Sequence, residues 1–243
     1  MRLTLPLCLL AGLLAAAEPT YRVENALREL TFDQPIGLAE VPGNSDKLLV
    51  VEKTGRVQEI GGLVENMLTK RVFLDLTQPR DGKFESGGEC GLLGLALHPR
   101  FNENGYAYVY YSLKIGGKLH QRLARFTLRP VPGGIGPCLD PNSELPLITQ
   151  ADPAANHNGG DVHFGPDGYL YFSCGDGGAG NDAFDHGGHI DKGFFAAVYR
   201  IDVDRRPGNL RPNPDTAVHT DPKGEALYAC LLYTSPSPRD ATL

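Results

Sequence analysis

The feature that most constrains the fold of this chain is a strand–turn–strand–loop–strand pattern that occurs three times. Each pass begins with a short apolar run, turns into a second run rich in aromatic and β-branched residues, and reaches a third run after a loop. The passes cover residues 35–60, 91–128 and 160–203. They recur at intervals of roughly 55–70 residues, near the length of a propeller blade with inserted loops. The pattern predicts an all-β fold, a β-propeller with about three blades.

Turn residues support this prediction. The pairs Asn104-Gly105 and Asp167-Gly168 stand between the first two strands of a pass, where a hairpin turn demands a residue that tolerates positive φ. The chain has 30 Gly and 19 Pro in 243 residues, which suits many short strands joined by turns. A β-sandwich with coincidental hairpins is the alternative. Three blades do not close a ring, so the natural polypeptide either continues or this chain is a fragment.

The N-terminus has the features of a secretory signal. Arg2 precedes an apolar run over Leu3–Leu14, and the small residues Ala15–Ala17 then offer a cleavage site. Residues 1–17 are therefore predicted to be a signal peptide, with no membrane span left after its removal. A buried N-terminal helix or a membrane anchor is the alternative. Export implies a secreted, periplasmic or extracellular protein in a disulfide-permissive setting.

The C-terminal segment breaks the pattern before it. Residues Cys230–Asp240 resemble the in-frame translation of a transposon-end adapter used in sequencing libraries. Residues 230–243 are therefore predicted to be non-native, and 18–229 to be a partial propeller domain that continues in nature past Ala229. A Pro/Ser-rich linker is the alternative.

Charge and cysteine content narrow the function classes. A net charge of -6 without a basic stripe argues against a nucleic-acid partner. No Gly-x-Gly-x-x-Gly motif opens a βαβ unit, which argues against a nicotinamide cofactor. Once both ends are set aside, Cys90, Cys138 and Cys174 remain, without metal-type spacing. A Cys90–Cys138 disulfide and three unpaired thiols both stay open.

His157 is the best acid–base candidate. It lies in the segment Asn156–Asp161, where Gly159 and Gly160 predict open backbone that a ligand can approach. A loop that enters a strand displays reactive groups, and an imidazole that titrates near neutrality can accept a hydroxyl proton. The alternative is a structural histidine bonded to a neighbouring loop, which is also how we interpret His98 and His163.

Asp176 stands in a glycine-rich segment, 175–182, that resembles an oxygen-rich cation loop. Hard cations bind several carboxylate and carbonyl oxygens on flexible backbone. The segment lacks the acidic spacing and closing Glu of an EF-hand. Asp176 is therefore a candidate ligand of a structural Ca²⁺, and a plain glycine-rich turn or a brace for the His157 loop are the alternatives.

Two segments, 89–112 and 156–178, resemble the glucose/sorbosone dehydrogenase family, and 191–204 resembles it more weakly. Members are six-bladed β-propellers that use pyrroloquinoline quinone (PQQ) and Ca²⁺. The resemblance implies that His157 is the catalytic base and that Asn156, Glu89, Gly159 and Gly160 lie at the cofactor. The chain departs from the better-studied soluble glucose enzymes, which carry Asp at the Asn156 position and Gln at the Glu89 position.

The resemblance also implies a reaction. An aldose or related sugar would be oxidised at its C1 hydroxyl, with hydride transfer to PQQ and electrons passed to an external acceptor. The family's basic residues that grip the PQQ carboxylates lie mainly in later blades, so a chain of this length is expected to be inactive by itself. Two alternatives remain: a non-catalytic propeller that binds protein or carbohydrate, as in hedgehog-interacting relatives, and a sugar-lactone hydrolase.

Overall fold

The computed structural model describes residues 21–187, 189 and 192–204 of the chain. Two units are distinguished, Met1–Leu30 and Thr31–Leu243. The described part of the first unit holds a single turn, closed by a hydrogen bond from Leu30 N to Leu27 O of 3.1 Å. The predicted signal peptide 1–17 and the predicted non-native tail 230–243 lie outside the described residues. All of the described strands belong to the second unit.

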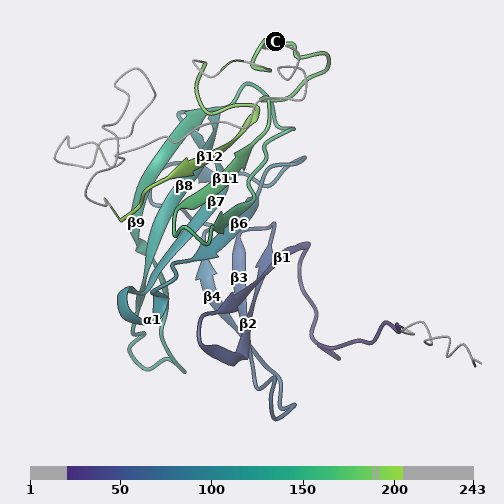
Figure 1. Cartoon of the computed structure of the whole chain (residues 1–243), viewed down its shortest axis with the longest axis vertical. Coiled ribbons are helices and arrows are strands. Elements are labelled where there is room, and N and C mark those ends of the chain that lie inside the picture. Colours follow the sequence, from purple (N-terminus) through teal and green to yellow (C-terminus); the bar gives the residue numbers. More distant parts are fainter. Residues whose placement is uncertain (1–20, 188, 190–191, 205–243) are drawn as a thin grey trace, which may run out of the picture. The chain divides into compact units, whose positions relative to one another are not determined.

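The described residues of this unit form three antiparallel sheets and one short helix (Figure 1). The first sheet has the order β1-β2-β3-β4, with β1 Pro35–Val41, β2 Asn44–Glu52, β3 Arg56–Gly61 and β4 Thr69–Asp75. The second sheet contains β5 Lys83–Phe84, β6 Leu92–Leu97, β7 Tyr106–Ile115, β8 Lys118–Arg129 and β9 Cys138–Ala151. The third has the order β10-β11-β12, with β10 Val162–Phe164, β11 Leu170–Cys174 and β12 Ala197–Ile201. The helix is α1, Phe101–Asn104.

These sheets confirm the three predicted passes, and they add three strands that the sequence did not predict, β4, β5 and β9. Each added strand pairs with a single neighbour: β4 with β3, β5 with β7 and β9 with β8. Pro141 and Pro146 lie within β9; proline argues against a central strand, but an edge strand tolerates it. The first three residues of β4, Thr69–Arg71, are polar, which hides that strand from an apolar pattern.

The two predicted turns differ in outcome. Gly168 has φ 77° and donates its N–H to Gly165 O at 2.8 Å, so a tight turn joins β10 and β11 as expected. The prediction of a hairpin turn at Asn104-Gly105 was wrong. Gly105 instead caps α1 with φ 65° and donates to Phe101 O at 2.7 Å. Gly105 does adopt the positive φ that the sequence predicted, but it ends the helix α1 rather than forming a hairpin turn.

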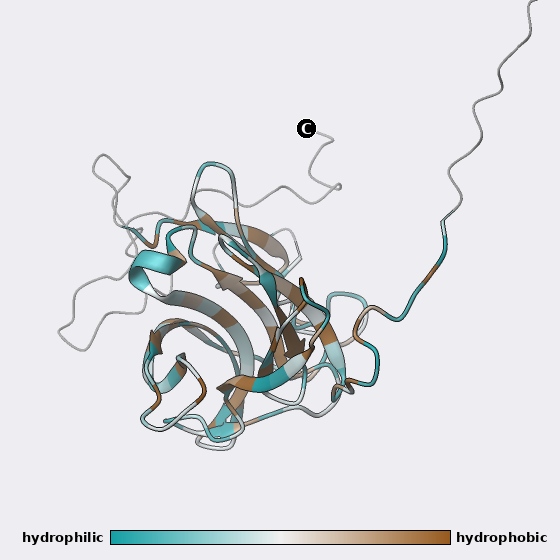
Figure 2. Cartoon of the chain, turned by 90° about the horizontal axis from the view of Figure 1, so that it is seen from below, coloured by the Kyte–Doolittle hydropathy of each residue, from teal (hydrophilic) through white to brown (hydrophobic). Residues whose placement is uncertain are grey.

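The core lies in two layers on either side of the second sheet. One layer joins the first and second sheets and includes Leu49, Val57, Leu95, Val109 and Phe126. The other joins the second and third sheets and includes Tyr108, Tyr110, Leu123, Phe172 and Tyr199. Figure 2 shows the apolar residues in brown along these strands. The first strands, β1 and β10, both contact β6, which is the arrangement of consecutive propeller blades.

Cysteine pairing and membrane spans can be stated for the described part of the chain. Cys90, Cys138 and Cys174 are all free thiols, so the Cys90–Cys138 disulfide does not form here. Burial raises the pKa of Cys174 to about 12, which makes this thiol unreactive. In the range that the structure describes, no helix is both long enough and apolar enough to span a bilayer.

Candidate active site

His157 lies on the connection between β9 and β10 in the left-handed backbone region, with φ 58°. This conformation is uncommon for residues other than Gly, although Asn, Asp and His adopt it more often than most, and it costs about 1–3 kcal/mol. The end of β11 presses on the loop at this point: a Cβ at Gly175 would stand 1.7 Å from His157 O. Only glycine permits this approach, so the loop and the segment after β11 fix each other.

Glu89 holds the same residue from the other side. Its Oε2 accepts a hydrogen bond of 2.6 Å from the backbone N of His157. The backbone N of Glu89 also donates to Ala155 O at 3.2 Å. The segment before β6 therefore braces the β9–β10 loop across two blades. This contact gives Glu89 a positioning role at His157, while its contact with a cofactor stays a prediction.

Asp176 orients the imidazole. Its Oδ1 lies 2.9 Å from His157 Nδ1 and accepts a second hydrogen bond, of 3.0 Å, from Gly178 N. Burial raises the pKa of Asp176, but the hydrogen bonds from Gly178 and His157 outweigh it and hold the pKa below its usual value. Asp176 is thus an anion at neutral pH, and it favours the tautomer with the proton on Nδ1.

The other edge of the imidazole is available. The His157 side chain is 45% exposed, and among the described residues Nε2 has no hydrogen-bond partner. In the tautomer with a proton on Nδ1, Nε2 is an acceptor. The arrangement can therefore take a proton from a ligand hydroxyl and stabilise the resulting imidazolium beside a carboxylate.

The described contacts of Asp176 support the bracing role that the sequence left open. Its Oδ1 is taken up by His157 and Gly178. Within the part of the chain that the structure describes, no group of three or more His, Cys, Asp or Glu side chains gathers to hold a metal ion. The Ca²⁺ role of Asp176 stays a prediction.

Asn156, Gly159 and Gly160 lie beside His157 in the same loop, and each also approaches other parts of the protein. Asn156 Oδ1 accepts a hydrogen bond of 3.3 Å from Ala179 N. A Cβ at Gly159 would stand 2.7 Å from the Cα atom of Cys174, and one at Gly160 would stand 2.5 Å from the Cβ atom of Leu93. Gly159 is exposed, as expected of open backbone, whereas Gly160 is buried, so the expectation of open backbone was wrong at that position. Their contact with a cofactor stays a prediction.

A buried polar chain lies beneath the loop and was missed by sequence reasoning. Gly91 N donates to Ser112 Oγ (3.2 Å), Ser112 Oγ donates to Gln121 Oε1 (2.8 Å), and Gln121 Nε2 donates to Asp152 Oδ2 (2.9 Å). When the Asn158 amide presents its nitrogen to Asp152, the two groups lie 3.2 Å apart. Burial raises the pKa of Asp152, and its hydrogen bonds only partly offset this effect. The only trace of this polar chain in the sequence is the presence of polar residues such as Ser112 and Gln121 inside otherwise apolar strands.

Three other histidines differ in environment. His98 is buried and bonded through Nδ1 to Arg100 N at 3.0 Å, which confirms its structural interpretation. His163 is exposed and paired with Asp161 at 2.8 Å. His186, which the sequence did not single out, places Nδ1 2.7 Å from Asp176 O.

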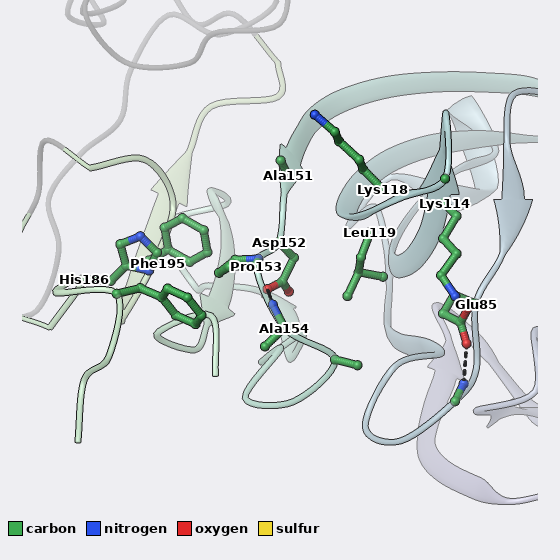
Figure 3. A pocket seen from close by; sticks show the side chains of 14 residues that line it. Glu85, Lys114, Lys118, Leu119, Ala151, Asp152, Pro153, Ala154, His186 and Phe195 are labelled. Atoms are coloured by element: carbon green, nitrogen blue, oxygen red, sulfur yellow. Dashed lines mark hydrogen bonds and ion pairs between the residues drawn. The ribbon is translucent and has the colours of Figure 1, made fainter. Parts of the chain in front are cut away.

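A cavity of about 800 Å³ opens beside the loop (Figure 3). One end is formed by His186 and Phe195, whose rings stack at 3.8 Å. The other end carries Lys114 and Glu85, with Asp152 between the two ends. The lining residues are Glu85, Gly87, Lys114, Gly117, Lys118, Leu119, Ala151–Ala155, Phe184, His186 and Phe195.

Comparison with known proteins gives three kinds of match. The family model described as Glucose / Sorbosone dehydrogenase matches residues 32–212. The human Hedgehog-interacting protein is 32% identical over 193 residues, which is 74% of this chain and 27% of that protein. The PQQ-bound aldose sugar dehydrogenase of Streptomyces coelicolor superposes with a TM-score of 0.56 at 24% identity, over 79% of this chain and 51% of that one.

A further solved structure, the soluble aldose sugar dehydrogenase of Escherichia coli in its apo-form, gives a TM-score of 0.53 at 20% identity. The match covers 73% of this chain and 47% of that structure. The likeness to these structures confirms the predicted β-propeller fold. The chain spans about half the length of the solved structures and about a quarter of the human relative.

Proposed function

The chain belongs to the glucose/sorbosone dehydrogenase family, and from this premise we propose that the complete protein oxidises an aldose or related sugar at its C1 hydroxyl group. The observation that carries the proposal is His157, with Nδ1 on Asp176 and an exposed Nε2 edge. His157 Nε2 would take the proton of the C1 hydroxyl while the hydride leaves the same carbon. Asp176 would stabilise the imidazolium that forms.

The described side chains fit the base side of a quinone site. PQQ, bound with Ca²⁺, would supply the acceptor for the hydride, and an external acceptor would then take up the two electrons. Asn156, Gly159 and Gly160 are proposed to line this site, and Asp176 is the candidate Ca²⁺ ligand. Among the described residues, His157 and Asn156 form hydrogen bonds with Glu89, Asp176 and Ala179 but with no Lys or Arg.

Charge decides which residues of a quinone site must come from elsewhere. Glu89 would repel the carboxylates of the cofactor, so the site needs cations to bind them. Each charge-assisted hydrogen bond from such a cation typically contributes about 1.5–3 kcal/mol to binding. Because this chain spans about half of the solved dehydrogenases, we propose that these cations come from blades outside this sequence. We also propose export, with residues 1–17 as a signal peptide, to a periplasmic or extracellular location.

A second candidate is a binding module without catalysis. It is favoured by the 32% identity to human Hedgehog-interacting protein, whose name refers to a partner rather than to a reaction. Both candidates use the same fold, and fold does not determine function.

Turnover distinguishes the two candidates. The complete protein would be reconstituted with PQQ and Ca²⁺, and reduction of an artificial dye would be followed with a panel of aldoses. Sugar-dependent reduction supports the dehydrogenase. A protein that binds the quinone, measured by its absorbance, yet oxidises no aldose would overturn the dehydrogenase and favour the binding module.

A further inference from the structure

The cavity beside the β9–β10 loop contains none of the candidate site residues in its lining. Its volume of about 800 Å³ falls within the roughly 300–1,000 Å³ of sites that hold whole small molecules. It nevertheless adjoins His157. Ala155 lines it and stands two residues before His157, so their Cα atoms are at most about 7 Å apart. His186, another lining residue, bonds the backbone of Asp176, the partner of His157.

Aromatic rings form one end of the cavity. His186 and Phe195 stack with an interplanar angle of 4°, and Phe184 lies 5.9 Å from His186. Phe184 is 37% exposed, so part of its ring is available to a ligand. The face of such a ring carries negative potential and attracts weakly positive C–H groups. One side of a pyranose ring presents a row of C–H groups of this kind.

The charged residues balance one another. Lys114 pairs with Glu85, while Lys118, for which no ion-pair partner is found among the described residues, faces the same cavity as the Asp152 carboxylate. Two cations and two carboxylates leave no formal excess, which disfavours both a phosphate and an ammonium ligand. Hydroxyl groups, which donate and accept, suit a carboxylate and an ammonium equally.

We propose that this cavity is a saccharide subsite, which holds the second unit of an oligosaccharide whose reducing-end unit reaches His157. This orientation of the sugar, with its reducing end at His157, rests on the proposed function. Phe184 provides the exposed stacking surface, backed by the stacked rings of His186 and Phe195, and Lys118 binds hydroxyl groups. The preferred substrates are therefore di- and oligosaccharides rather than free hexoses.

Binding of glycosides that lack a free C1 hydroxyl tests the subsite without turnover. Methyl glucoside, methyl maltoside and methyl cellobioside would be titrated into the complete protein by calorimetry. We expect at least one disaccharide glycoside to bind about tenfold or more tighter than methyl glucoside. Phe184→Ala and Lys118→Gln should each lose most of this preference. Ile135→Ala, which truncates a 97% exposed residue between β8 and β9, should retain it, and circular dichroism would verify folding of all variants.

The outcomes separate this proposal from the proposed function. Equal binding of mono- and disaccharide glycosides, no binding of either, or a preference that survives both cavity variants would overturn the subsite. Dye reduction by aldoses, followed in parallel, reports on the oxidation. Oxidation without a disaccharide preference leaves the dehydrogenase and removes the subsite, whereas a preference that depends on Phe184, without oxidation, supports the subsite and removes the dehydrogenase.

Discussion

His157 Nδ1 lies 2.9 Å from Asp176 Oδ1, and this pair joins the β9–β10 loop to the segment that follows β11. The carboxylate fixes both the ring orientation and the tautomer of the candidate base. Glu89 acts at the backbone of the same residue. His157 is thus held at its ring by one blade and at its backbone by another, and each contact gives a separate prediction.

Replacement of Asp176 by Asn tests the ring contact. An amide keeps the size of the side chain but loses the charge that stabilises the imidazolium. We expect kcat for aldose oxidation to fall by roughly 10–100-fold, as for other partners that orient a reactive group, with little change in KM. Steady-state kinetics of dye reduction measure this. Asp161→Asn, at an exposed neighbouring carboxylate, is the control and should keep wild-type kcat.

The backbone contact predicts different results for two substitutions of Glu89. Glu89→Gln keeps an oxygen that can accept the hydrogen bond from His157 N, whereas Glu89→Ala does not. We expect kcat/KM to fall roughly tenfold in the Ala variant, equivalent to about 1.4 kcal/mol, and to change little in the Gln variant. The Gln variant should also bind PQQ more tightly, because a repulsive charge is removed. Equal losses in both variants would argue against this role.

Gly175 predicts a stability defect. A Cβ there would stand 1.7 Å from His157 O, a backbone atom that has no flexible end to move aside. Gly175→Ala should lower the free energy of unfolding by about 3 kcal/mol or more. Gly180→Ala is the matched control, since nothing lies within 4 Å of its added Cβ, and it should stay within about 0.5 kcal/mol of wild type. Chemical denaturation measures both values.

Asp152 predicts a pH dependence of stability. Because burial raises its pKa in the folded chain, the folded state binds this proton more tightly than the unfolded state. Stability from this group therefore rises as pH falls through the raised pKa toward the ordinary value of 3.8, and falls as pH rises. Asp176 affects stability in the opposite direction, because its pKa is lowered in the folded chain. Its stabilising effect is lost only as pH falls below the ordinary pKa of 3.8. Asp152→Asn should flatten the slope above pH 3.8; an unchanged slope would contradict this assignment.

Local sequence pattern was enough for the inner strands, because apolar runs are visible within a few residues, and it singled out His157 as a candidate base because this residue stands beside two glycines. The edge strand β9 was missed because Pro141 and Pro146 argue against a strand in the sequence. They are tolerated here because one side of β9 is unpaired. The bond between Glu89 and His157 joins residues 68 positions apart. Such contacts, like the Gln121–Asp152 bond and the cavity, arise from packing between blades, which no local pattern encodes.

The role of His157 as the base is open to the most direct test. The complete protein, reconstituted with PQQ and Ca²⁺, would be compared with His157→Ala and with His163→Ala, an exposed histidine on β10. We expect aldose-dependent dye reduction to fall by roughly 10²–10⁴-fold in His157→Ala, with PQQ binding intact and with His163→Ala unchanged. Wild-type turnover in the His157→Ala protein would contradict this role.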